Sequence, residues 1–472
     1  MMLRAILQEF ADEAQEQIEQ LQEELEATLD IARYEQGLKE RLDRLAAELT
    51  QTAIEELLAE REMLAKLRQI GGKLALRFKE YRTVRVRLAN GQSIEVQVPY
   101  FVRAQSKRGR KKRGPNGSGC YLGLEVLGFI EKYSPALIGE VVKLAVLSPS
   151  LDVAQEMLVG QGVELDVKTI RRLCSLLGAM GIAGRGQVSL SGDENLAGRT
   201  LVIGIDGGRL RERRRKRGRK KEGQKRQGYY TDWREPKLFT MYLVDAQGET
   251  VKQFDPLHDA TMGDHVVLFA LLEQYLTALD LSGVSRIVFC GDGASWIWSD
   301  VEEMCHKLGL EQTCPVYQVL DYTHAKQNLQ NIIDLLPRSL NGKPLTTLSQ
   351  DWKTLLWEGD IQGLYTQITQ RFKGNKKKKA LKKWRDFFEG NQQRLQYATF
   401  HSLHLPCGSG CVESAIRRVI NLRLKSAGTF WTKQMAECFL FLRSQLLSGR
   451  WTTFLRNVTR PKALMMLNAG GA

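Results

Sequence analysis

The sequence predicts a multidomain α+β protein, in which N-terminal helices and a helix-turn-helix-like region precede a mixed α/β core that carries an all-α insertion. Three observations lead to this fold class. Leucines near the N-terminus recur at steps of three and four residues, which is a helical period. From Thr200 the pattern changes to apolar runs rich in β-branched and aromatic residues, and these runs alternate with amphipathic helices. Residues 345–405 lack strand patterns and are polar and lysine-rich.

Composition and charge favour a cytoplasmic protein that binds a polyanion. No apolar run approaches the roughly 20 residues that a membrane span needs, and the eight cysteines include no CxxC pair, as is usual in a reducing compartment. The chain carries a net charge of +15, although residues 1–62 hold 17 acidic and 6 basic side chains. The rest is therefore strongly positive, which favours nucleic acid as a partner over a merely solubilising basic surface.

Residues 1–80 are expected to form long helices. Their acidic heptad-like pattern fits a coiled coil that dimerises, and it fits equally a helical hairpin packed on its own chain. Residues 81–120 alternate like strands around Asn90-Gly91, which is a strong hairpin signal. The hairpin leads into a basic, glycine-containing loop at 106–119 that cannot build a core.

Residues 121–183 return to helical spacing and predict a helix-turn-helix-like DNA-binding domain. Two helices flank a glycine-containing turn at 160–162, and Asp166 is a suitable N-cap for the second helix. Many helical bundles share this pattern, so a purely structural role stays open. The candidate major-groove contacts are three cations on the second helix: Lys168, Arg171 and Arg172. Residues 184–199 are expected to be a linker.

Residues 200–344 are expected to form the first part of the α/β core, residues 345–405 the helical insertion, and residues 406–460 the closing helices, with a break near Ala427-Gly428. The predicted strands have the sequences TLVIGI, KLFTMYLV, SRIVFC and PVYQVL. Strands followed by strand–helix alternation are typical of a mixed sheet.

Three of these strands lead into an aspartate, at Asp206, Asp292 and Asp321. Sites in α/β sheets gather at the carboxyl ends of strands. One such aspartate alone is more commonly a turn residue or helix cap, but three in one domain favour a metal site. Glu413 follows a Gly-Ser-Gly break and falls in the first turn of a helix, where it could instead only stabilise that helix.

Two of the strand aspartates together with Glu413 offer hard oxygen ligands, which suit Mg²⁺ or Mn²⁺ rather than zinc. Two such ions about 3.5–4 Å apart can clamp a phosphodiester, activate the attacking oxygen and stabilise the leaving one. The sequence contains no GxxxxGK[ST], GxSxG or HExxH motif. A zinc site is the weaker alternative, because the available residues lack a common zinc spacing: His401, His404, Cys407 and Cys411.

Four motifs together resemble bacterial insertion-sequence DDE transposases of the ISKra type: IGIDGGRLRER, CGDGASWIW, QVLDYTHAKQNL and GSGCVESAIRRVINLRLKSAGTFW. The resemblance spans residues 200–435, is looser over 80–180 and is uninformative over 1–70. It implies a ribonuclease-H-like core whose catalytic, metal-binding residues are Asp206, Asp292 and Glu413. It places Asp321 and His324 next to them as supporting groups.

The resemblance also implies a reaction and its partners. The expected enzyme uses two Mg²⁺ or Mn²⁺ ions to cleave double-stranded DNA at terminal inverted repeats and to join the 3′-hydroxyl to target DNA. It would work in the bacterial nucleoid as a homodimer or larger assembly. The alternatives are a stand-alone metal-dependent nuclease and a retired transposase that only binds DNA.

Basic segments are the expected DNA-phosphate contacts. Arg209 to Arg226 contains 12 Arg or Lys in 18 residues and is expected at the tip of the first hairpin of the core. Residues 373–384 are a second lysine-rich segment, in the insertion. The candidate contacts are Arg209, Arg211, Arg213, Arg214, Arg215, Lys216, Arg217, Lys376, Lys377, Arg417, Arg423 and Lys425.

Overall fold

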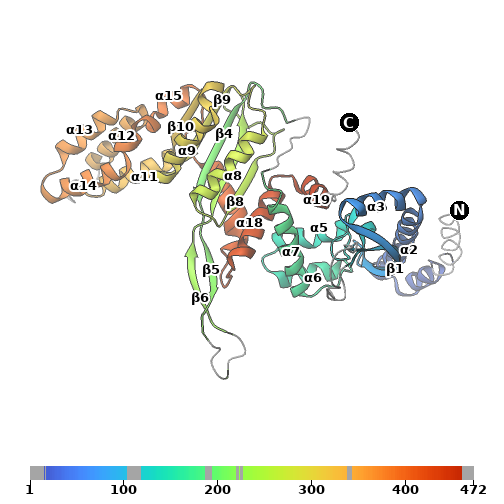
Figure 1. Ribbon diagram of the computed structural model, residues 1–472. Helices are drawn as coiled ribbons and strands as arrows, with labels where there is room; N and C mark the ends of the chain where they lie inside the picture. The colour runs from blue at the N-terminus through green and yellow to red at the C-terminus, as the bar shows by residue number, and fades with distance from the viewer. Residues whose placement is uncertain are drawn as a thin grey trace. The chain divides into compact units, whose positions relative to one another are not determined.

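The computed structural model describes residues 15, 18–103, 119–186, 194–218, 223, 227–336 and 343–459. They divide into two compact units, one from Met1–Leu177 with Thr452–Ala472 and one from Gly178–Trp451 (Figure 1). Nearly all of the predicted basic loop at 106–119 lies outside the described residues. Within the described ranges, no helix is both long enough and apolar enough to pass through a membrane.

The first unit begins with helices that pack on a β-hairpin. Its elements are α2 (Ile31–Ala59), α3 (Arg61–Lys73), β1 (Leu76–Arg87), β2 (Ser93–Arg103) and the short β3 (Gly119–Cys120). The predicted hairpin is confirmed, because β1 and β2 pair antiparallel and Gly91 has the positive φ of 81° that its turn requires. Leu58 and Leu67 of the helices share a core with Val96 and Phe101 of the hairpin. This part of the N-terminal helices therefore packs on its own chain, and dimerisation stays a prediction.

Helices complete the first unit. They are α4 (Leu122–Val126), α5 (Pro135–Leu147), α6 (Leu151–Gly160), α7 (Val167–Ile182), whose last residues belong to the second unit, and α19 (Trp451–Thr459). The backbone N–H of Thr169 donates to the Asp166 carboxylate over 2.9 Å, which confirms the predicted N-cap of α7. The helices of the predicted helix-turn-helix-like region therefore form, and DNA recognition by them stays a prediction.

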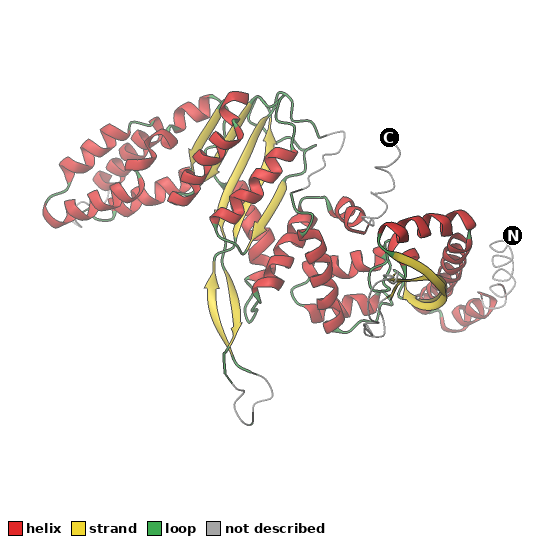
Figure 2. Ribbon diagram, viewed as in Figure 1, coloured by secondary structure: helices red, strands yellow, loops and turns green. Residues whose placement is uncertain are grey.

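A five-stranded mixed sheet forms the centre of the second unit (Figure 2). Its strands are β4 (Thr200–Gly207), β7 (Lys237–Val244), β8 (Leu257–Thr261), β9 (Arg286–Gly291) and β10 (Val316–Leu320), in the order β10-β9-β4-β7-β8. β4, β9 and β10 run parallel, whereas β7 is antiparallel to both β4 and β8. The predicted mixed α/β sheet is confirmed, although β8 was not predicted.

Two groups of helices pack on this sheet. The first is α8 (His265–Ala278), α9 (Ser295–Leu308) and the short α10 (Leu310–Thr313), with α8 against α9 and β7. The second is α16 (Gly410–Ala415), a π-helix (Ile416–Asn421), α17 (Leu422–Leu424) and α18 (Lys433–Leu447), which contact β4, β7 and β8. The predicted break between the closing helices is confirmed at Gly428, whose φ is 72°.

The all-α insertion is also confirmed, and it extends the core of the sheet beyond β10 (Figure 1). It follows α11 (Tyr322–Ile333) and consists of α12 (Lys343–Glu358), α13 (Ile361–Arg371), α14 (Gly374–Phe387), a 3₁₀ helix (Glu389–Leu395) and α15 (Tyr397–Ser402). Trp352 is fully buried in it, and its indole N–H donates to Gln367 over 2.9 Å.

A two-stranded ribbon leaves the sheet between β4 and β7 and projects away from it (Figure 1). Its strands are β5 (Leu210–Arg215) and β6 (Tyr229–Arg234), which pair antiparallel. The predicted basic hairpin is confirmed in its described part, whereas most of the tip, 219–222 and 224–226, lies outside the described residues.

Arg185 corrects the prediction that residues 184–199 are a linker. Its guanidinium is almost buried and donates to both carboxylate oxygens of Asp259 on β8, over 2.6 and 2.8 Å, and to Glu437 on α18 over 2.5 Å. The described beginning of this segment is therefore part of the core, because it neutralises two carboxylates there. Residues 187–193 lie outside the described residues.

Candidate functional site

Three aspartates lie at one edge of the sheet, where neighbouring parallel strands end. Gly291, the last residue of β9, pairs with Ile205 on one side and with Leu320 on the other. Asp206, Asp292 and Asp321 each follow one of these paired residues directly. Register alone therefore brings together the three carboxylates that the apolar strands predicted.

Asp321 joins two segments of this site through hydrogen bonds from their backbones. It is 1% exposed, and it caps α11 by accepting the backbone N–H of His324 over 2.7 Å. Its other oxygen accepts the backbone N–H of Ser409, whose hydroxyl donates to Glu413 over 3.1 Å. Burial alone raises the pKa of Asp321, but the hydrogen bonds from His324 and Ser409 outweigh burial and lower it. A buried, ionised carboxylate thus fixes the loop that presents Glu413.

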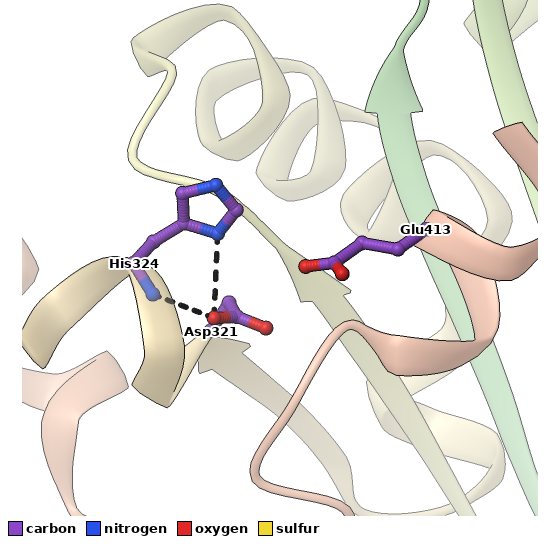
Figure 3. Close-up of side chains that lie close together, drawn as sticks. All are labelled: Asp321, His324 and Glu413. Atoms are coloured by element: carbon purple, nitrogen blue, oxygen red, sulfur yellow. Dashed lines mark hydrogen bonds and ion pairs between the residues drawn. The ribbon is translucent and has the colours of Figure 1, made fainter. Parts of the chain in front are cut away.

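Asp321, His324 and Glu413 each offer one ligand atom within 4.8 Å of the other two (Figure 3). The Nδ1 atom of His324 lies 3.3 Å from Asp321, whose hydrogen bond raises the pKa of His324 despite its partial burial. The carboxylates of Asp292 and Asp206 raise that pKa further. His324 therefore carries a proton more readily than an ordinary histidine, and it places that proton beside the acidic groups.

Asp206 responds to the same group of charges. The pKa of Asp206 is raised to about 6, mainly by burial and further by the negative charges of Asp292 and Glu413, although the backbone N–H of Gly207 and the charge of His324 act to lower it. The charges of Asp292 and Glu413 therefore reach Asp206, although neither Asp206 nor Asp292 belongs to the described group of ligand atoms that lie within 4.8 Å of one another. Asp292 is held by its own turn, because it accepts the backbone N–H of Ala294 over 2.9 Å.

Gly204 lets the helix of Glu413 approach the strand of Asp206. A Cβ at position 204 would meet Cβ of Val412 at 2.9 Å and a methyl group of Thr240 at 3.2 Å. Both neighbouring atoms belong to buried, β-branched side chains, so neither side chain can change rotamer without a cost in packing energy. No sequence pattern predicts this contact or the hydrogen bonds of Ser409 to Asp321 and Glu413, since each joins segments far apart in the chain.

Gly204→Ala is expected to lower the free energy of unfolding by about 1–3 kcal/mol, because it overpacks the contact between β4 and α16. The same shift would displace Glu413 from Asp206. Urea denaturation measures the first effect. Gly390→Ala is the matched control, since nothing lies within 4 Å of the added Cβ. If Gly204→Ala were as stable as Gly390→Ala, the close approach would be refuted.

The predicted DNA contacts fall into exposed and buried groups. Two of the candidates, Arg211 and Lys377, are partly exposed. Most of the others are exposed: Arg209, Arg213, Arg214, Arg215, Lys216, Arg217, Lys168, Arg171, Arg172, Lys376, Arg417 and Lys425. Arg172 forms an ion pair with Glu131. Arg423 is a correction: it is 4% exposed and lies over the rings of Trp431 and Phe439, so its guanidinium is not presented to a phosphate.

The alternative zinc site is not formed. Among the described residues, the one group of three or more potential metal ligands is Asp321, His324 and Glu413. The thiol of Cys407 instead faces the backbone carbonyl of Tyr397 at 3.8 Å.

The chain was compared with models of protein families, with curated proteins and with solved structures, and no match was found in any of the three comparisons.

Proposed function

We propose that this chain is a DDE-type DNA transposase with a ribonuclease-H-like core, which cleaves DNA at transposon ends and joins the 3′-hydroxyl to target DNA. The observation that carries the proposal is the position of Asp206 and Asp292 at the ends of adjacent parallel strands, with Glu413 held near the same edge of the sheet through Ser409 and Asp321. Those residues come from the motifs that resemble the ISKra-type transposases. The mixed sheet, with acids at the ends of adjacent parallel strands, supports the same core.

The donor set fits Mg²⁺ or Mn²⁺. Asp206, Asp292 and Glu413 supply carboxylate oxygens, and a bound divalent cation would offset the negative charges of Asp292 and Glu413 that oppose the ionisation of Asp206. Two such ions, when bound, supply activation of the attacking oxygen and stabilisation of the leaving oxygen. Asp321 and Ser409 keep Glu413 in position, and the protonated ring of His324 donates to a phosphate oxygen at the edge of the site.

The exposed cations support DNA as the substrate. They lie on the β5–β6 ribbon, on α14 and on the segment after Glu413, all within the unit that carries the acids. Arginine and lysine at such positions hold phosphates without reading sequence. Lys168 and Arg171 on α7 are proposed to contribute recognition of the inverted repeats. Since two transposon ends must be handled together, the proposal includes a homodimer or larger assembly on DNA.

The deciding experiment uses duplex oligonucleotides that carry the inverted repeats bracketing this reading frame, with a target plasmid and Mg²⁺. A transposase releases a 3′-hydroxyl end and then joins it to the plasmid. A pre-cleaved end tests joining separately. Hydrolysis without joined product, even from the pre-cleaved end, would favour the stand-alone nuclease. Binding without cleavage would favour the retired transposase.

The raised pKa of Asp206 predicts the pH dependence of metal binding. A carboxyl group must lose its proton to bind a cation, and Asp206 does so only above about pH 6. The affinity for Mn²⁺ without DNA is therefore expected to be constant above about pH 7 and to fall about tenfold by pH 5. Titration calorimetry at several pH values measures this. An affinity unchanged down to pH 5 would exclude Asp206 as a ligand.

A further inference from the structure

One face of the β5–β6 ribbon combines cations with exposed aromatic rings. Directly opposed residues of an antiparallel pair point to the same face, and the face alternates along each strand. Three register pairs therefore share one face: Arg211 with Trp233, Arg213 with Thr231, and Arg215 with Tyr229. Arg209 joins them, since its guanidinium lies 5.7 Å from the centre of the Trp233 ring. We call this set of residues the cationic-aromatic face.

The two rings on this face are open to solvent. Trp233 is 52% exposed and Tyr229 is 46% exposed. Large aromatic side chains are costly to leave in water, and exposed ones on a soluble surface commonly mark a binding site. A two-stranded ribbon has no core of its own that could cover them.

The charges of the ribbon are divided between its faces. Residues 209–218 and 227–234 contain eight cationic side chains and two acidic ones. Both acids lie on the opposite face, where Glu212 pairs with Arg234 over 2.7 Å and Asp232 pairs with Arg214. The ribbon's own acids thus neutralise cations on that face only, and the cationic-aromatic face keeps its positive charge for an anionic ligand.

The face continues onto the segment that follows the helix of Glu413. The guanidinium of Arg211 lies 4.7 Å from the centre of the Phe430 ring, and that ring lies 5.7 Å from the ring of Tyr229. Trp431 fixes this contact, because its backbone exchanges hydrogen bonds of 2.9 and 2.7 Å with β5. At its other end the ribbon begins a few residues after Asp206. The ribbon therefore follows Asp206 in the chain, and the segment that contains Phe430 follows the helix of Glu413, so both parts of the face are connected to proposed catalytic acids.

Aromatic rings among the cations distinguish between two forms of DNA. Phosphates of a duplex need only cations, because the bases are stacked inside and cannot reach a flat surface ring. Bases of a single strand stack on exposed aromatic side chains while their phosphates lie against neighbouring cations. Guanidinium groups packed beside the rings, as Arg211 is beside Trp233, add to such a platform.

We propose that the cationic-aromatic face binds a single-stranded segment of DNA, with bases stacked on Trp233 and Tyr229 and phosphates held by Arg213 and Arg215. This inference rests on the proposed function in taking DNA as the ligand. It assigns the ribbon to the strand that separates from the duplex near the cut, rather than to the duplex backbone alone.

The test measures the affinity of the full chain for two fluorescent probes, an oligothymidine of about 15 nucleotides and a duplex of the same length. Trp233→Leu combined with Tyr229→Leu is expected to weaken oligothymidine binding at least tenfold and duplex binding less than twofold. Trp233→Phe with Tyr229→Phe is expected to retain single-strand binding, because the rings remain. Tyr81→Leu is the control, since this ring is similarly exposed but lies on β1.

The outcomes separate this inference from the proposed function. Equal losses for both probes, or no loss for the oligothymidine, would overturn single-strand stacking and leave the transposase proposal standing. Absence of binding to both probes by the wild-type chain would refute DNA as the ligand altogether. Tryptophan fluorescence is an independent readout: oligothymidine is expected to quench the emission that Trp233→Phe removes, and unchanged emission would contradict the inference.

Discussion

Replacement of Asp206 or Asp292 by asparagine is expected to lower the rate of DNA strand cleavage about 10³-fold or more. Each substitution removes a negatively charged oxygen from the proposed metal site. A divalent ion contributes several kcal/mol of transition-state stabilisation, and each 1.36 kcal/mol corresponds to about tenfold in rate. Glu413→Gln is expected to have an effect of the same order. Single-turnover cleavage of end-containing oligonucleotides in Mg²⁺ measures the loss.

Stability distinguishes this loss from unfolding. The pKa of Asp206 in the folded chain, about 6, lies above the usual value of 3.8. The folded state therefore loses stability as the pH rises from about 4 through 6, where the buried carboxyl group becomes charged. Asparagine carries no such charge. At pH 7.5 without metal, the free energy of unfolding of Asp206→Asn is expected to exceed that of the wild-type chain by about 1–3 kcal/mol, so the variant unfolds at a higher urea concentration.

Asp245→Asn is the matched control for these variants. Asp245 also follows a strand of the sheet, but β7 is antiparallel to β4, so Asp245 lies at the opposite edge. It accepts backbone N–H groups of its own turn, from Gln247 and Glu249, over 2.9 Å. Its replacement is expected to leave cleavage within about twofold. An Asp292→Asn variant that cleaves like Asp245→Asn would refute the site.

The strand aspartates were predictable because buried parallel strands are continuous apolar runs. The carboxylate of Asp206 at the end of β4, and those of Asp292 and Asp321 directly after β9 and β10, mark the strand ends in the sequence itself. Glu413 was predictable from the glycine break before its helix. Ser409 and Gly204 were not, because their roles depend on partners that only the tertiary structure supplies. Arg423 shows the opposite error: an arginine in a basic segment is buried between aromatic rings.

The strand β8 escaped prediction because its sequence, LHDAT, does not have a strand pattern. All five of its residues are buried, including His258 and Asp259. Their polar groups have partners elsewhere in the chain: His258 Nδ1 lies 2.8 Å from the hydroxyl of Thr240, and the hydroxyl of Tyr275 donates to Asp259 over 3.0 Å. Polar residues can form a buried strand when distant segments satisfy them, and local sequence does not report those segments.

Arg185→Met is expected to lower the free energy of unfolding by about 3–5 kcal/mol, because it leaves the fully buried carboxylate of Asp259 without its cation. Burial alone lowers the pKa of Arg185, but Asp259 and Glu437 outweigh burial and raise it, so the guanidinium remains charged. Urea denaturation at pH 7.5 measures the loss. Lys307→Met is the control, since the side chain of Lys307 is 61% exposed in its ion pair with Glu273 and such a surface pair contributes at most about 1 kcal/mol.

A second substitution separates this buried charge from simple loss of packing. Asp259→Asn in the Arg185→Met background removes the uncompensated carboxylate, so the double variant is expected to be more stable than the sum of the two single losses implies. Additive losses would mean that Arg185 stabilises the core through its aliphatic stem alone. Non-additive losses would show that Arg185, which lies in the predicted linker, holds β8 against α18 through its charge. Because β8 pairs with β7, this contact supports the same sheet in which β4, β9 and β10 position the three aspartates of the site.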